Sequence, residues 1–298
     1  MSDEPFVRHS DRSFSDPVLV LGMDGWIDAG LGAGSAMAHL LASMETEPIA
    51  TFDGDTFIDY RARRPMVRIT DGVTDALSWP EIKLLAGTDR DGHDVLVLVG
   101  PEPDMRWVEF VDAVVLLAGQ LGVRLSTALG AFPLSVPHTR PVRLAATATS
   151  RALADSVGTV PGTIEVPAGV HTAIQEGFGR AGIPAVSLWA RVPIYAANFP
   201  YPAASAALVE GLATVAGLSF DTADLNAAAA MASSRIDEMI AASEEHSQMV
   251  RQLELAADAE AAAPPVLDFS DLPSGDEIAA ELERFLRGEG GSTGSGPS

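Results

Sequence analysis

The stretch "LVLGMDGWIDAGLGAGSA", residues 19–36, joins an apolar run to a glycine-rich turn and then to a helix-length segment. A buried strand leading into a helix is the basic unit of α/β proteins. The turn has neither the Gly-x-Gly-x-x-Gly spacing of a dinucleotide site nor the Lys-Ser or Lys-Thr of a P-loop. We therefore expect glycines that shape a tight turn and an Asp28 that caps the helix, with an anion-binding turn as the alternative.

Similar apolar runs recur along the whole chain. They lie at residues 17–22, 48–52, 66–69, 94–100, 124–130, 143–149 and 185–190. Helix-length amphipathic or alanine-rich segments lie between them, at about 29–43, 104–121, 168–181 and 203–216. Runs that are apolar on both faces are typical of strands in a covered sheet. The alternation predicts an α/β domain with a mostly parallel central sheet flanked by helices.

The sequence changes character near Asp221. No glycine or proline occurs from there until residues 264 and 265, so one long helix or a broken pair is expected. Its apolar residues recur every three or four positions in a narrow seam. We expect a second helix at 275–288 to pack against it as a helical hairpin. The predicted organisation is an N-terminal arm (1–13), an α/β domain (14–220), a helical segment (221–288) and a flexible Gly/Ser tail (289–298).

Composition excludes several classes of function. The 298 residues carry a formal net charge of −22, which disfavours a nucleic-acid partner. Cysteine is absent, so thiolate chemistry and disulfides are excluded. The six histidines lack the spacing of a zinc motif, and we expect neither a metal nor a cofactor. No apolar run approaches the roughly 20 residues of a membrane span, and no secretory signal is present, so a cytoplasmic protein without a membrane partner is expected.

The segment "FDGDTFIDYRARRP", residues 52–65, gathers scarce positive charge beside three aspartates. If residues 52–56 are extended, Asp53 and Asp55 point to one side. Arg61 and Arg64 could then face them, since a guanidinium grips a carboxylate with two hydrogen bonds. An ion-pair network that fixes a loop or a subunit contact is the favoured interpretation. The alternative is an anion site in which an aspartate acts as acid or base.

Two further segments follow strands, at the end where open α/β sheets bind ligands: "GPEPDMRWVEF" (100–110) and "GAFPLSVPHTRP" (130–141). The first either lines a pocket or simply begins and anchors a helix. In the second, His138 is either a general base or a structural histidine. No Gly-x-Ser-x-Gly elbow occurs, and no catalytic set is assigned. The candidate pocket or interface comprises Asp28, Asp53, Asp55, Asp59, Arg61, Arg64, Asp104, Arg106, Trp107, His138 and Arg140.

Several motifs together resemble the proteasome assembly chaperone 2 family, in particular its actinobacterial branch. They are "GWIDAG", "FDGDTFIDYRARRP", "GPEPDMRW", "GAFPLSVPHTRP", "SLWARVPIYAANFPYPAASAAL" and "LPSGDEIAAELERFLR", in order from about residue 14 to residue 287. The resemblance implies an α/β domain similar to nucleoside phosphorylases, a C-terminal helical segment and a homo-oligomer, with a trimer favoured.

The family resemblance also implies a function. It suggests a non-enzymatic protein that acts through protein contacts, with a proteasome-related partner. The alternative is a small-molecule-binding protein, or a hydrolase- or phosphorylase-like enzyme, with its pocket at the carboxyl ends of the strands. A third interpretation makes the acidic helical segment a regulatory interaction arm.

Overall fold

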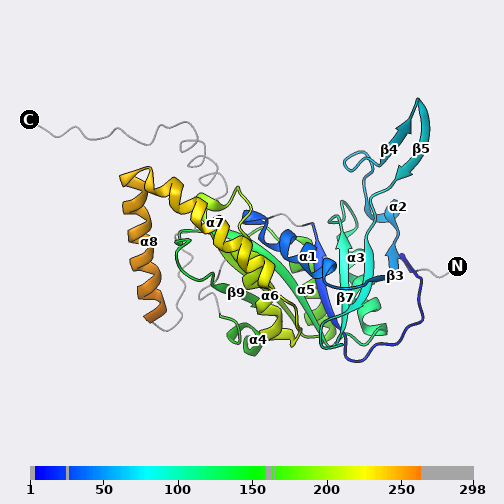
Figure 1. The fold of residues 1–298 in the computed structure, drawn as a ribbon. Coiled ribbons are helices and arrows are strands. Elements are labelled where there is room, and N and C mark those ends of the chain that lie inside the picture. Colours follow the sequence, from blue (N-terminus) through cyan, green and yellow to red (C-terminus); the bar gives the residue numbers. More distant parts are fainter. Residues whose placement is uncertain (1–3, 25–26, 159–162, 164, 263–298) are drawn as a thin grey trace, which may run out of the picture.

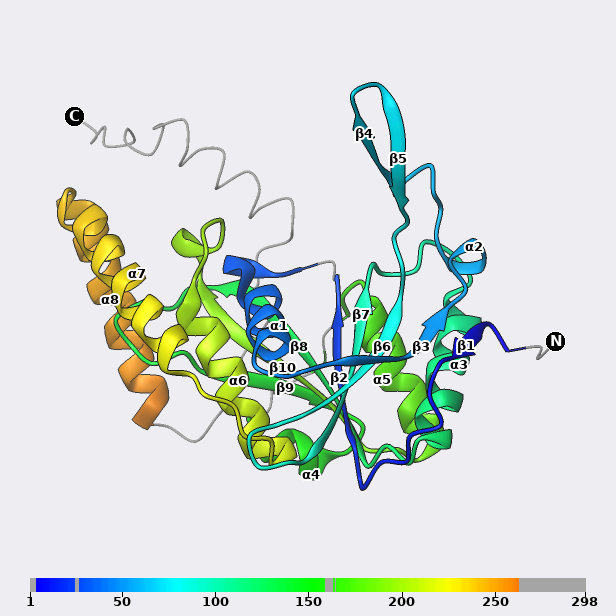
Figure 2. The same cartoon turned by 45° about the vertical axis from the view of Figure 1, so that its right-hand side comes forward.

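The computed structural model describes residues 4–24, 27–158, 163 and 165–262. Figures 1 and 2 show a central sheet with helices on both faces, a projecting hairpin and a pair of C-terminal helices. The predicted helix at 275–288 and the predicted tail at 289–298 lie outside the described residues. The predicted domain boundaries remain a prediction.

An eight-stranded sheet forms the centre of the molecule. In spatial order its strands are β1 (Phe6–Arg8), β3 (Glu47–Phe52), β6 (Lys83–Thr88), β7 (Asp94–Gly100), β2 (Val18–Met23), β8 (Leu125–Leu134), β10 (Ala185–Pro193) and β9 (Leu144–Ala148). The four strands from β7 to β10 run parallel. The flanking strands pair antiparallel on both sides. The predicted α/β fold with a helix-flanked sheet is confirmed, and its parallel part is this central group.

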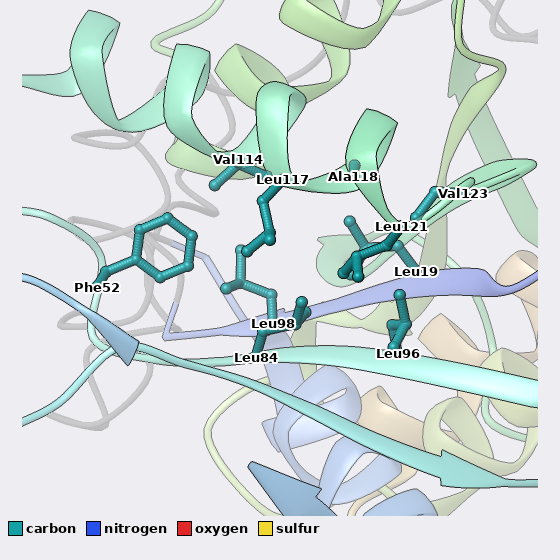
Figure 3. Close-up of a pocket in the computed structure, with 10 residues that line it drawn as sticks. All are labelled: Leu19, Phe52, Leu84, Leu96, Leu98, Val114, Leu117, Ala118, Leu121 and Val123. Carbon is teal, nitrogen blue, oxygen red and sulfur yellow. The ribbon is translucent and has the colours of Figure 1, made fainter. Parts of the chain in front are cut away.

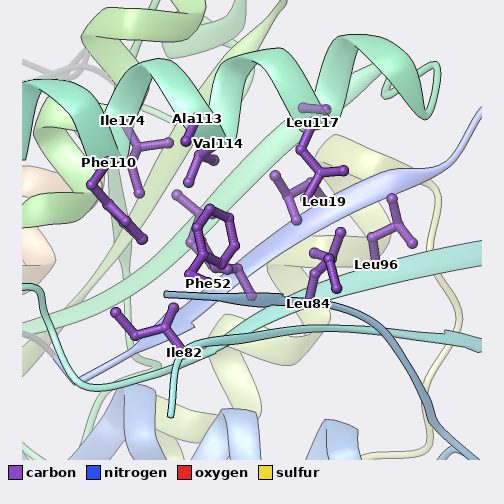
Figure 4. Close-up of a cluster of buried hydrophobic side chains, with 14 of the residues drawn as sticks. Leu19, Phe52, Ile82, Leu84, Leu96, Phe110, Ala113, Val114, Leu117 and Ile174 are labelled. Atoms are coloured by element: carbon purple, nitrogen blue, oxygen red, sulfur yellow. The ribbon is translucent and has the colours of Figure 1, made fainter. Parts of the chain in front are cut away.

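Helices cover the two faces because the strands are apolar on both. In β2, Leu19 and Leu21 pack under α3 (Trp107–Gln120) and α5 (Val170–Ala181). Val18 and Val20 face α1 (Gly32–Ala42) and α6 (Pro202–Ala216) on the other side, as the two-residue strand period requires. Figure 4 shows the first layer, where α3 lies over β2, β7 and β6.

Two strands lie outside the central sheet. β4 (Met66–Thr70) and β5 (Val73–Ser78) pair with each other and project from the molecule (Figure 2). The run at 66–69 is therefore a strand, but the expectation that it belongs to the covered sheet is wrong. Asp71 and Gly72 both adopt positive φ, 51° and 81°. This is the two-residue turn that sends a strand straight back on itself.

The C-terminal part forms a broken helix pair, α7 (Ala223–Ala241) and α8 (Glu244–Ala262). Ala242 and Ser243 separate the two helices. Ile236 and Val250 are their buried residues, so the pair covers little apolar surface. The remaining short elements are η1 (Ala29–Leu31), α2 (Gly54–Phe57), α4 (Arg151–Asp155) and η2 (Ile194–Ala196).

Candidate functional site

Asp28 caps α1, as the sequence predicts. Its two carboxylate oxygens accept hydrogen bonds from the backbone N–H of Ala33, at 2.7 Å, and of Gly34, at 2.9 Å. Burial raises the pKa of Asp28, while these backbone hydrogen bonds lower it. Gly30, in the turn between them, needs its positive φ of 64°. The carboxylate is thus committed to holding the start of a helix.

The Asp–Arg segment differs from its predicted geometry. Residues 52–56 are not extended throughout, because Asp53 follows the end of β3 and caps α2, accepting a hydrogen bond from the backbone N–H of Asp55. The helical turn also buries Phe57 against Phe52 and Phe110, which stabilises it over an extended chain. The prediction that Arg61 and Arg64 face Asp53 and Asp55 is wrong.

Asp104 is the carboxylate that ties this segment down. It accepts a hydrogen bond from the backbone N–H of Asp59, at 2.9 Å, and pairs with Nε of Arg63, at 3.1 Å. The side chain of Asp59 in turn accepts from the backbone N–H of Arg61, at 2.8 Å. Two loops far apart in sequence are joined in this way at the base of the β4–β5 hairpin.

The start of α3 belongs to the same region. Arg106 has a left-handed backbone, with φ of 57°, and pairs with Glu109. The Trp107 indole N–H donates to the carbonyl oxygen of Pro103, at 2.7 Å, and its ring packs on the core. The geometry matches the interpretation of this segment as a helix start with an aromatic anchor.

His138 lies in a different place, against α7. Its Nδ1 is 2.9 Å from the Tyr195 hydroxyl and its Nε2 is 3.0 Å from Oδ1 of Asp237. The backbone N–H of His138 also donates to the Tyr195 hydroxyl, at 2.8 Å. Burial is the main cause that raises the pKa of Tyr195 to about 12. The His138 side chain is 1% exposed and contacts Asp237 of α7. It therefore holds α7 in place and does not face a pocket.

Arg140 holds α8. It makes two parallel hydrogen bonds to Asp258, at 2.8 and 2.9 Å, and a third to Glu254, at 3.2 Å. Its hydrogen bonds to Asp258 raise the pKa of Arg140 above its ordinary value and lower that of Asp258.

Two more arginines extend this contact. Glu260 pairs with Arg143, at 3.1 Å, and with Arg191, at 2.8 Å. Arg191 is 6% exposed, and its Nε is buried without a hydrogen-bond partner within the described chain. We call this contact the α8 clamp: Arg140, Arg143 and Arg191 with Glu254, Asp258 and Glu260.

The candidate residues therefore do not form one pocket. Asp53, Asp55, Asp59, Arg61, Arg64, Asp104, Arg106 and Trp107 lie around the base of the hairpin, His138 and Arg140 lie under α7 and α8, and Asp28 caps α1. Sequence analysis missed Arg63, Tyr195, Asp237, Arg143, Arg191 and the acidic residues of α8. One signal for the α8 clamp was available: Glu254 and Asp258 are spaced to share one helix face.

The apolar layer under α3 contains a small cavity of about 10 Å³ (Figure 3). Leu19, Phe52, Leu117 and Leu121 are among its lining residues, all of which are apolar. A cavity must be about this large to hold one water, which would also need polar partners. It is a packing gap of the core, too small for a ligand.

Metal and membrane sites were sought in the part of the chain that the structure describes. No three histidine, aspartate or glutamate side chains there gather closely enough to hold a metal ion. None of the helices found among those residues combines the length and apolar character that crossing a bilayer requires.

A mixed sheet with helices on both faces and a C-terminal helix pair places the chain among three-layer α/β proteins. The chain belongs to the PAC2 family, whose profile matches residues 22–240. The family resemblance found in the sequence is thereby confirmed. A search of curated proteins found no match.

Solved structures of the same kind come from actinobacteria. A Mycobacterium tuberculosis protein of unknown function is 37% identical, with coverage of 88% of this chain and 91% of that one and a TM-score of 0.74. A proteasome-assembly chaperone homologue from Mycobacterium tuberculosis is also 37% identical, with coverage of 78% and 99% and a TM-score of 0.71. A PAC2 family protein from Streptomyces avermitilis is 33% identical, with coverage of 79% and 100% and a TM-score of 0.70.

Proposed function

We propose that this chain is a non-enzymatic, cytoplasmic homo-oligomer that acts through protein contacts in the proteasome pathway, with a trimer as the favoured form. The observation that carries the proposal is the similarity to the Mycobacterium tuberculosis proteasome-assembly chaperone homologue. That similarity is 37% in identity and extends over 99% of the related chain.

The site geometry supports contacts over catalysis. Asp28 and Asp53 cap helices, while Asp104, His138 and Arg140 tie loops and helices together. These side chains have structural roles and are divided among separate places in the fold, whereas a catalytic set gathers its groups around one reacting centre. The alternative of a phosphorylase-like enzyme rests on the fold, which by itself does not carry an activity.

Reconstitution with purified proteasome subunits tests the proposal. We expect this protein to bind free α-subunits in sedimentation velocity experiments and to change the rate at which α- and β-subunits assemble. An unrelated acidic protein of similar size serves as the control for non-specific charge effects. A wild-type protein that neither binds α-subunits nor alters the assembly rate contradicts the proposal.

A further inference from the structure

The β4–β5 hairpin and its base, residues 60–79, form what we call the hairpin arm. Every residue of both strands is exposed to solvent. Met66 is 73%, Val73 67% and Trp79 48% exposed. An isolated two-stranded hairpin is at best marginally stable in water, and exposed apolar residues grouped on a surface mark an interaction site. We therefore expect the arm to bind a partner.

One face of the arm is apolar. Val67 lies opposite Leu77 in the strand register. Ile69 follows Val67 by two residues along β4, and a β-bulge between Arg68 and Ile69 makes Thr74 its partner. The side chains of Val67, Leu77 and Ile69 are 46%, 47% and 60% exposed. The opposite face carries Arg68 across from Ala76. Both faces project clear of the central sheet (Figure 2), so another molecule can reach either one.

The arm also carries positive charge that the rest of the described chain leaves unpaired. Residues 60–79 contain four arginines and two aspartates, Asp71 and Asp75, so the arm has a net charge of +2 in a chain with a net charge of −22. Arg63 pairs with Asp104. Arg61, Arg64 and Arg68 are exposed, and no carboxylate of the described residues lies within the 4.0 Å of an ion pair. The surface that complements the arm is thus acidic with apolar patches.

We propose that the hairpin arm binds the acidic surface of a second copy of this chain. Because the arm is a cationic part of an acidic chain, another copy of the chain offers the complementary charge. Pairing of two arms would place one net positive charge against another, so we expect a head-to-tail contact. A head-to-tail contact forms a ring when the rotation between copies closes, as a trimer requires. This inference rests on the oligomer of the proposed function and identifies the segment that makes its contact.

The apolar part of the contact is tested by molar mass from light scattering. In the variant Val67→Ser, Ile69→Ser, Leu77→Ser we expect loss of the oligomer and a mass near the 31.1 kDa of one chain. The matched control changes three other exposed aliphatic residues, Val7, Val108 and Leu255, to serine; they are 63%, 72% and 72% exposed. The control keeps the wild-type mass. An arm variant that keeps it too, or a wild-type protein that is itself monomeric, overturns the inference.

Charge and orientation are tested separately. Changing Arg61, Arg64 and Arg68 to glutamate is expected to give a monomer, while changing them to lysine keeps the charge and the oligomer. Thr74→Cys tests the head-to-tail contact on a background without cysteine. Oxidation of this variant leaves the chains unlinked if the two arms are apart. Efficient disulfide linkage between the tips of two arms overturns the head-to-tail contact.

Binding of purified proteasome α-subunits by the same variants separates this inference from the proposed function. Monomeric arm variants that still bind α-subunits support an arm dedicated to self-association. Wild-type oligomers that bind no α-subunit contradict the proposed partner and leave the arm inference standing. Arm variants that keep the wild-type mass but lose the α-subunits show that the arm serves another protein, which overturns the inference.

Discussion

At the residue scale, Nε2 of His171 is buried without a hydrogen-bond partner in the described chain, and burial lowers its pKa from 6.5 to about 4. The folded protein keeps this ring neutral down to about pH 4. The unfolded chain takes up the proton below about pH 6.5. Lowering the pH through this window therefore favours unfolding, by at most about 1.4 kcal/mol per pH unit. The variant His171→Leu should show a shallower loss of the free energy of unfolding between pH 6.5 and 4.

Urea unfolding at a series of pH values measures this effect. His9→Leu is the matched control, because His9 lies exposed near the N-terminus. We expect the control to keep the wild-type dependence on pH. Equal slopes for wild type and His171→Leu would show that His171 is protonated equally in both states.

Leu117 gives a second test at this scale, because it lines the core cavity and is 2% exposed. Truncating the Leu117 side chain removes buried apolar contacts. It also enlarges the core cavity, which the surrounding side chains leave unfilled. Leu117→Ala should lower the free energy of unfolding by about 2–5 kcal/mol. The neighbouring Leu116, 46% exposed on the same helix, is the control, and Leu116→Ala should have little effect. Similar losses in both variants would contradict the assignment of Leu117 to the core.

Single residues show how far sequence patterns reach. Asp28 was correctly predicted as a cap, because a short carboxylate before a helix has few other roles. Asp53 was predicted wrongly, since the strand period ignores that its side chain can bond to the next turn of backbone. Asp104 pairs with Arg63 and not with Arg61 or Arg64. Arg63 and Asp104 are 41 positions apart in the sequence, so no local pattern predicts this pair.

At the scale of elements, the α8 clamp holds α8 mainly by ion pairs, most of them between partly exposed groups, since Val250 is the buried residue of that helix. Such pairs weaken when salt screens them. In the double variant Arg140→Gln, Arg143→Gln we expect faster hydrogen exchange in α8, with exchange in α6 unchanged. Added salt should have a similar effect on the wild-type protein.

Arg180→Gln is the control for the α8 clamp. It removes ion pairs to Asp112 and Glu176 on a different surface, so α8 should exchange as in the wild type. Exchange in α8 that is unchanged by both the double variant and salt would show that packing alone holds this helix.

Elements that bury apolar runs were predicted well. The strands at 94–100 and 185–190, and the helix at 203–216, agree with β7, β10 and α6 to within a few residues. β6 was missed because its run, "KLLAGT", is short and begins with lysine. The Asp-Gly dipeptide at 71 and 72 is a hairpin signal in the sequence, since both residues of such a turn need positive φ. The break between α7 and α8 contains neither glycine nor proline, so the sequence is compatible both with one long helix and with a broken pair.

At the scale of the whole molecule, strand order was beyond sequence reasoning. β2 lies between β7 and β8 in the sheet, although β3 and β6 separate β2 from β7 along the chain. Local patterns specify which residues are buried, but many orders of strands bury the same residues. For the same reason, sequence patterns predicted single candidate residues but not which of them lie together in the fold. His138 and Asp237 meet across 99 positions, through a helix pair whose docking the sequence did not indicate.

Arg64 provides a test at this scale, because it is exposed and has no ion pair within the described chain. Removing its charge should therefore leave the folding of one copy unchanged and weaken the contact between copies. For Arg64→Ala we expect dissociation of the oligomer at about tenfold higher protein concentration, which corresponds to about 1.4 kcal/mol. The contact should also weaken in salt, and less steeply in the variant than in the wild type.

Sedimentation equilibrium over a dilution series measures the association, and thermal unfolding of dilute protein measures the single copy. Arg8→Ala is the matched control: Arg8 is an exposed arginine whose side chain binds the carbonyl of Ser10 and no carboxylate among the described residues. It should change neither quantity. Because partner binding raises apparent stability by mass action, melting temperatures should converge at high dilution if Arg64 acts between copies. A melting temperature that stays lower at every dilution would instead show that Arg64 stabilises its own chain.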